Sequence, residues 1–156
     1  MNSRNSGLPF FPISVWYSGG KARAPMLSDL TPESPRRWRD DLEQIHALGF
    51  RCVRTWIEWA HCEPRPGEYH FENLQLLCEL AEEVGLRVVI QMYVDSAPDW
   101  VGREYPDAPF EAQSGEKVPS QAAPGFCLDH EGVARAVLDF YTATARIAAG
   151  YPNLFG

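Results

Sequence analysis

The sequence predicts an α/β fold made of parallel βαβ units. Apolar segments of strand length alternate along the chain with longer segments in which apolar residues recur at helical spacing. The segments LGFRCV (48–53) and VGLRVV (84–89) repeat one order of residues: a helix end, a glycine, an apolar residue, an arginine and the start of a strand. Such a repeat, with a helix between the strands, indicates parallel strands joined by crossover helices.

The amino-terminal part of the chain predicts one strand and one helix. Residues 11–17 are apolar and β-prone, and Ser18-Gly19-Gly20 ends this first strand. Thr31-Pro32 and Ser34-Pro35 each offer an N-cap followed by a proline suited to the first helical turn. From there the helical period is carried by Trp38, Leu42 and Ile45, so we expect the helix to end at Gly49.

The segment 51–71, RCVRTWIEWAHCEPRPGEYHF, predicts a second strand that runs into a ligand-facing loop. Strand residues alternate between two faces, so Val53, Thr55 and Ile57 share one face. The opposite face carries Cys52, Arg54, Trp56 and Glu58. A strand that is aliphatic on one side and charged on the other is typical of a position between a helix layer and a polar cavity. The turn that follows is fixed by Pro64, Pro66 and Gly67.

Residues 73–94 predict the next helix and the next strand. Apolar residues follow the helical period up to Gly85, at Leu74, Leu77, Cys78, Ala81 and Val84. The third strand covers 86–94 and repeats the two-faced pattern, with Val88, Ile90, Met92 and Val94 on one side. Its other side carries Gln91, Tyr93 and Asp95.

The remaining chain predicts a long loop, a last helix and the start of a fourth strand. Residues 95–130 are rich in Pro, Gly and Ala, and loops of this length are usually functional or disordered. Asp129 can cap a helix that ends near Gly150, with the apolar period at Val133, Val137, Phe140, Thr144 and Ile147. Residues 151–156 lie where a fourth strand should begin.

Composition excludes several classes of function. The net charge is −7, and no Lys/Arg cluster with interleaved aromatics is present, so nucleic acid is not an expected partner. No apolar stretch is long enough for a membrane span, the start lacks a signal-peptide core, and residues 1–9 are expected to be flexible. We therefore expect a cytoplasmic protein without a membrane partner. The four cysteines form no C-x-x-C pair and His61-Cys62 lacks a third ligand at usable spacing, so neither predicts a metal site.

The residues VRTWIEWAHCEPRPGEYHF resemble the second strand and following loop of the clan A glycoside hydrolases, most closely the family 42 β-galactosidase-like enzymes. The APDW run at 97–100, Tyr105-Pro106 and Cys127 resemble the long third loop of the same family. This resemblance implies the amino-terminal portion of a (β/α)8 TIM barrel, with about three βα units plus the start of strand four. A complete barrel needs at least ~200 residues, so residues 1–156 would form an incomplete barrel within one catalytic domain.

The resemblance also implies a retaining glycosidase, which needs two carboxyl groups roughly 5 Å apart. In this clan the acid/base is the Glu of an Asn-Glu pair that ends the fourth strand, and the nucleophile is a Glu that ends the seventh. None of the four asparagines is followed by Glu, so we expect this chain alone to lack both catalytic carboxylates. Glu58 and Asp95 end neighbouring strands and are weak candidates for a replacement pair. No cofactor is implied.

Arg54, Tyr93 and Gln91 are the candidate sugar-binding residues on the strands. Arg54 matches the family's arginine that contacts the sugar, and an internal salt bridge with Glu58 is the alternative, because an unpaired buried guanidinium is very costly. Tyr93 and Gln91 would form the floor of the site. Carbohydrate, as a β-galactoside or a related glycoside, is the expected partner.

Trp59 and Trp100 are candidates for stacking on a sugar, because an aromatic face can bury the apolar C–H side of a pyranose. Core packing is the alternative, favoured for Trp56 and Trp38 and disfavoured for Trp100 by its place in a loop. Glu63 is expected to hold the Glu-Pro turn instead of acting in catalysis.

Two other functions stay open. Within the same class, a β-glucanase or mannanase would share the second-strand pattern. From a different class, a non-catalytic half-barrel could bind carbohydrate or assemble with another chain, because the open sheet edges of an incomplete barrel allow self-association.

Overall fold

The structure of the chain, a computed structural model, describes residues 13–20, 25–120 and 122–156. The strands β1 (Val15–Trp16), β2 (Cys52–Glu58) and β3 (Arg87–Tyr93) form one parallel sheet in that order. The predicted α/β fold with parallel βαβ units is therefore confirmed. Residues 1–9, expected to be flexible, and residues 11 and 12 of the first expected strand lie outside the described residues.

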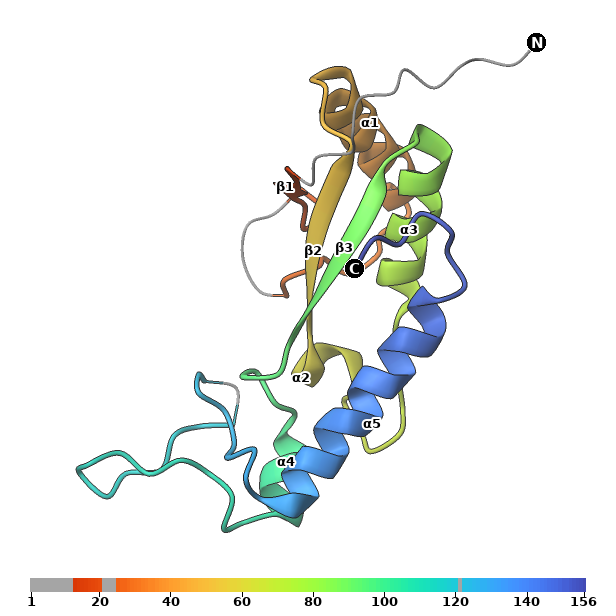
Figure 1. Cartoon of the computed structure of the whole chain (residues 1–156). Coiled ribbons are helices and arrows are strands. Elements are labelled where there is room, and N and C mark those ends of the chain that lie inside the picture. Colours follow the sequence, from red (N-terminus) through yellow and green to blue (C-terminus); the bar gives the residue numbers. More distant parts are fainter. Residues whose placement is uncertain (1–12, 21–24, 121) are drawn as a thin grey trace.

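The helices lie along one side of the sheet (Figure 1). Helices α1 (Ser34–Ala47) and α3 (Glu72–Val84) follow β1 and β2 and contact each other. The short helices α2 (Trp59–Cys62) and α4 (Asp99–Glu104) lie beyond the carboxyl ends of β2 and β3, in the lower half of Figure 1. Helix α5 (Glu131–Ala148) runs back from that end, and the carboxyl terminus returns beside β3.

The sheet has the two faces that the alternation predicts. Val53 pairs in register with Val15 and with Val88, and Val53, Thr55, Ile57 and Val88 are buried on the helix side. Residues on adjacent parallel strands in register point to the same side. The opposite face therefore carries Arg54, in register with Trp16, together with its neighbours of the same parity on β2 and β3.

Helix α1 buries Trp38 and Leu42 completely, with Ile45 packed beside them. Its start corrects the expected capping: the N-cap residue is Glu33, which makes no side-chain cap. Ser34 is already helical, and its hydroxyl accepts a hydrogen bond from the Thr31 N–H at 2.9 Å. The helix ends at Ala47, two residues before Gly49, which adopts a positive φ of 98°.

Helix α3 ends as expected at Gly85, whose left-handed conformation (φ 85°) a residue with a Cβ rarely adopts. The Gly85 N–H donates to the carbonyls of Ala81 and Glu82, and the Leu86 N–H also donates to Ala81. This sharp stop turns the chain directly into β3.

The expected start of a fourth strand is present beside β3. Leu154 forms a parallel bridge with Val88, and the Val88 N–H donates to the Asn153 carbonyl at 3.0 Å. Further along, the Phe155 N–H donates to the Val88 carbonyl, and the Ile90 N–H donates to the Gly156 carbonyl at 2.7 Å. The last residues of the chain thus occupy the first half of the β3 edge.

The long segment after β3 differs from the expected loop, because it contains α4. The cap of α5 also differs: His130, and not Asp129, is the N-cap, and its Nδ1 accepts from the Val133 N–H at 3.4 Å. None of the helices in the described ranges is long and apolar enough to cross a membrane.

The cysteines are free thiols, of which Cys52, Cys62 and Cys78 are buried and Cys127 is partly exposed. Burial raises the pKa of the Cys62 thiol to about 12, with a smaller contribution from the charges of Glu58 and Glu72. Burial also raises the pKa of Cys78 to about 12. Because the thiolate is the reactive form, these two groups should be inert in the folded chain.

We expect an aromatic disulfide reagent to react with Cys127 in the native chain, and with the three buried thiols only after denaturation. The measurement is the absorbance released per chain with and without guanidinium. Cys127→Ser is the control and should abolish the native reaction. Fast reaction of that variant before denaturation would show that the buried thiols are accessible.

Candidate functional site

The face of the sheet opposite the helices gathers polar and aromatic side chains toward the carboxyl ends of β2 and β3. Trp56 lies in register with Gln91, and Glu58 with Tyr93, so all four side chains project from the same face. In a parallel α/β sheet this end is where ligands bind. It is also where the alternation places the candidate residues.

Three aromatic rings cross this face, one from each strand. The ring centroids of Trp56 and Tyr93 are 5.9 Å apart at an interplanar angle of 27°, and those of Trp16 and Trp56 are 6.0 Å apart at 43°. The Arg54 Cζ atom lies 5.5 Å from the Trp56 ring centroid, within cation–π range. Trp16 is 41% exposed although it is large and apolar. The face therefore combines flat apolar surface with one cation.

Arg54 does not form the alternative salt bridge with Glu58. Within the described residues no ion pair joins the two side chains, and the buried Glu58 Oε2 instead accepts the Met26 N–H at 3.0 Å. The guanidinium of Arg54 is half-buried against Trp56. Its donors therefore remain directed to the open face of the sheet, and not to the acid four residues away on the same strand.

Glu58 and Asp95, the weak catalytic candidates, have different surroundings. Glu58 holds the backbone of the segment before α1 through Met26. Asp95 lies beyond the end of β3 and lines a hollow with Phe126 and Cys127. No described residue bridges the two carboxylates.

Gln91 and Tyr93 lie on the face of β3 where the alternation places them. Gln91 is exposed on the open face, and Tyr93 is half-buried by its stacking on Trp56. Sequence reasoning assigned Trp56 to the core, whereas its ring lies on this open face and its buried Nε1 has no partner among the described residues. The alternation with Arg54 and Glu58 does predict this face, and only the preference for core packing is wrong.

Trp59 and Trp100 are packed in the core. Trp59 is 1% exposed, stacks on Phe140 of α5 at 6.1 Å and meets the Trp100 ring edge to face at 5.9 Å. Trp100 is 5% exposed and lies in α4, so the expectation of an open ring in a loop is wrong. In this structure neither indole offers a free face to a sugar.

Glu63 holds the turn after β2, as expected. Its Oε2 accepts the Trp59 indole N–H at 2.7 Å, and its Oε1 accepts the Gly67 N–H at 2.8 Å. Its carbonyl accepts the Trp100 indole N–H at 2.9 Å. Burial raises the pKa of Tyr69 to about 12, with the charge of Glu63 and a hydrogen bond to it adding to the effect. Both carboxylate oxygens of Glu63 therefore accept hydrogen bonds that hold this turn.

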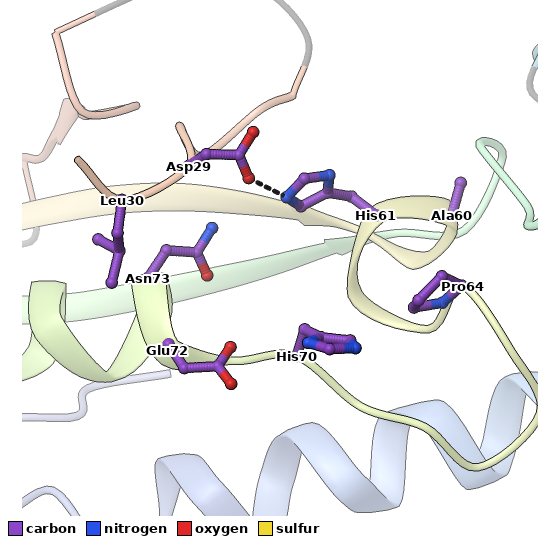
Figure 2. Close-up of a pocket in the computed structure, with 8 residues that line it drawn as sticks. All are labelled: Asp29, Leu30, Ala60, His61, Pro64, His70, Glu72 and Asn73. Carbon is purple, nitrogen blue, oxygen red and sulfur yellow. Dashed lines mark ion pairs between the residues drawn. The ribbon is translucent and has the colours of Figure 1, made fainter.

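A second hollow lies between the segment before α1, α2 and the start of α3 (Figure 2). His61 Nε2 lies 2.8 Å from Asp29 Oδ1, which ties α2 to the segment before α1. The hollow has a volume of about 670 Å³. Its lining residues are Asp29, Leu30, Ala60, His61, Pro64, His70, Glu72 and Asn73. The described residues contain no group of three or more His, Cys, Asp or Glu side chains that could hold a metal ion.

Sequence reasoning missed Asp29 and the Asp29–His61 pair. No local sequence pattern predicts this pair, because Asp29 and His61 belong to different βα units and meet only when these units pack side by side.

Comparison with known proteins decides the family. The sequence model of glycoside hydrolase family 42, described as beta-galactosidase, matches residues 29–155, most of the chain. The chain belongs to this family. The expected resemblance to its (β/α)8 barrel is confirmed, and the described βα units correspond to the amino-terminal part of that barrel.

Relatives of this family 42 chain are much longer than it is. A probable beta-galactosidase A of Emericella nidulans is 50% identical over 39 residues, which are 25% of this chain and 4% of that protein. The crystal structure of the beta-galactosidase from the psychrophilic Marinomonas ef1 has a TM-score of 0.65 and 20% identity, covering 90% of this chain and 20% of that one. An exo-beta-1,4-mannosidase from Opitutaceae bacterium strain TAV5 has a TM-score of 0.53 and 20% identity, covering 82% and 22%. At this identity the two solved structures support the fold alone.

Proposed function

We propose that the complete protein is a retaining glycoside hydrolase that removes terminal β-galactosyl residues, and that this chain supplies the first βα units of its barrel and part of the sugar-binding rim. The family match supports the reaction class. The observation that carries the proposal is the open face of the sheet, where Arg54, Trp56 and Tyr93 lie together at the end where barrel enzymes bind ligands.

The residues of this chain would bind and orient the sugar. The Arg54 guanidinium would donate hydrogen bonds to a sugar hydroxyl or to a catalytic carboxylate, as a charge-assisted contact. Tyr93 and Gln91 would line the floor through their hydroxyl and amide groups, and the Trp16–Trp56 surface would exclude water below them.

The catalytic carboxylates are proposed to lie outside this chain. Retaining hydrolysis needs an acid/base and a nucleophile about 5–5.5 Å apart, which form and then hydrolyse a covalent glycosyl-enzyme. The chain contains no Asn-Glu pair. Glu58 is held by the Met26 backbone and shares no described partner with Asp95, which supports a catalytic pair outside this chain.

A chromogenic β-galactoside tests this proposal. We expect no turnover by the 156-residue chain, and turnover by a protein extended through any open frame that continues after codon 156 and includes an Asn-Glu strand end. The control variants Glu58→Gln and Asp95→Asn should leave the rate of the 156-residue chain at background. Turnover by this chain that either variant abolishes would overturn the proposal. A natural stop codon after Gly156 would instead favour a non-catalytic half-barrel.

A half-barrel that binds carbohydrate or assembles with another chain is the second candidate. The observation in its favour is backbone left for pairing: among the described residues β1 is paired with β2 alone, and residues 153–156 cover only the first half of the β3 edge. A concentration-dependent rise in mass by light scattering would support assembly. Within the hydrolase class, β-glucanase or mannanase specificity is the alternative, because clan A enzymes share the second-strand pattern, and parallel assays with nitrophenyl β-mannoside and β-glucoside distinguish the substrates.

A further inference from the structure

A hollow of about 290 Å³ lies just beyond the carboxyl end of β3, next to the proposed sugar face. Asp95 lies two residues after Tyr93, the last residue of β3, where the chain bends away from the strand. The lining residues are Val94, Asp95, Phe110, Pro124, Phe126, Cys127, Leu128 and Asp129. None of the residues discussed above as the sugar floor belongs to this set.

The wall of this hollow is held in place by backbone contacts. Gly125 has a φ of 73°, and a Cβ at this position would lie 2.8 Å from the Asp95 carbonyl oxygen. The Ala97 N–H donates to the Ser120 carbonyl at 3.1 Å, and the Cys127 N–H donates to the Ala108 carbonyl at 3.0 Å. The segment after α4 is therefore packed onto the strand end, and the hollow is part of the fold.

The lining is apolar except for two acids. Phe110 and Leu128 are 38% and 54% exposed although they are apolar, and the lining also contains the buried Phe126. The charged lining residues are Asp95 and Asp129, and neither carboxylate has an ion pair or hydrogen bond with another described residue. Among the described residues, no Lys or Arg lines the hollow. Its shape and chemistry suit a ligand with an apolar face and a positive charge.

We infer that this hollow is a subsite for a hexosamine ring carrying a free, protonated amine. The inference rests on the proposed function, because it names a sugar class for the rim of the same site. The C–H face of the pyranose would lie on the exposed Phe110 and Leu128 side chains, and the ammonium group would pair with Asp95 and Asp129. A neutral hexose or an N-acetylated sugar has no charge to offer these carboxylates. The apolar wall favours a sugar ring, and the two carboxylates favour a sugar with a protonated amine.

Calorimetric titration of the 156-residue chain with glucosamine, N-acetylglucosamine and galactose tests the inference. We expect glucosamine to bind about tenfold more tightly than the other two sugars, because one charge-assisted hydrogen bond contributes about that factor to affinity. This preference should fall with added salt, and it should vanish when the pH is raised until the amine loses its proton. Asp95→Asn and Asp129→Asn should each weaken glucosamine binding by about tenfold.

Matched variants separate binding from folding. Glu111→Gln removes an exposed acid from the same long segment outside the lining, and it should leave glucosamine affinity unchanged. Phe110→Ala should weaken glucosamine binding because it removes the contact with the sugar ring. It leaves both carboxylates in place, so the remaining binding should keep its salt dependence. Circular dichroism spectra matching the parent chain establish that each variant is folded.

Equal affinity for glucosamine and N-acetylglucosamine, or unchanged glucosamine binding in folded Asp95→Asn and Asp129→Asn variants, would overturn the inference. These results are distinct from failure of the proposed function. An extended protein without activity on any chromogenic glycoside would refute the hydrolase, and titration of this chain would still report on the hollow.

Discussion

Replacing Trp59 by alanine should lower the free energy of unfolding of the chain by about 3–5 kcal/mol. The indole is almost fully buried between Phe140 of α5 and Trp100 of α4, and its N–H donates to Glu63 at 2.7 Å. The substitution would open a cavity between the β2 loop, α4 and α5 and would remove the indole donor from the buried Glu63 carboxylate. Urea denaturation followed by circular dichroism measures the change.

Two variants give this experiment its controls. Trp59→Phe keeps an aromatic ring against Phe140 but removes the donor to Glu63, so we expect an intermediate loss of about 1–3 kcal/mol. Trp16→Ala changes a tryptophan that is 41% exposed on the open sheet face, and it should cost less than about 1 kcal/mol. Equal losses for Trp59→Ala and Trp16→Ala would contradict a core role for Trp59.

The sequence predicts the regular elements well where one physical signal dominates. Period-two alternation identifies β2 and its two faces, because the strand lies between a helix layer and an open face. Gly85 marks the end of α3, because it has the positive φ that stops the helix. The start of a fourth strand is likewise expected from the order of units, and Leu154 bridges Val88.

Features that depend on distant partners are not predicted. Trp100 is taken for an open loop residue because its surroundings are rich in Pro and Gly, but it is buried by Trp59 and by the Glu63 carbonyl. These partners come from a different βα unit, so no local pattern reports them. The choice of His130 over Asp129 as the cap of α5 depends on a one-residue shift of the helix start, which propensity does not resolve.

The same difference between local patterns and distant partners applies to the candidate site. Arg54 and Tyr93 are placed on one face by alternation and register alone, and the structure has them there. The pairing of Glu58 with Asp95 needs side chains to converge, and Glu58 is instead held by Met26, which alternation cannot indicate. The sequence therefore predicts on which face and near which strand end a residue lies. It does not predict the individual side-chain contacts, because these form only when the βα units pack together.

In the complete protein, for which we propose β-galactoside hydrolysis, Arg54→Gln should lower kcat/KM by roughly 10- to 150-fold, which corresponds to about 1.5–3 kcal/mol for hydrogen bonds to a charged group. The reason is that Arg54 makes no ion pair with Glu58 and lies over Trp56 on the open face, where its donors remain for the sugar or a catalytic carboxylate. Steady-state kinetics with a nitrophenyl galactoside measure the loss.

Arg87→Gln is the matched control for this variant. Arg87 projects from the same face of β3 but lies at its first residue, in register with Cys52, and its guanidinium carbon lies 5.4 Å from the Phe155 ring centroid. Because this is the end of the strand away from the proposed site, kcat/KM should stay within about twofold of the parent enzyme. Arg54→Gln should leave the thermal midpoint within a few degrees of the parent. A fall in kcat/KM that tracks a fall in the midpoint, or an equal loss in Arg87→Gln, would assign Arg54 to the stability of the sheet and not to substrate binding.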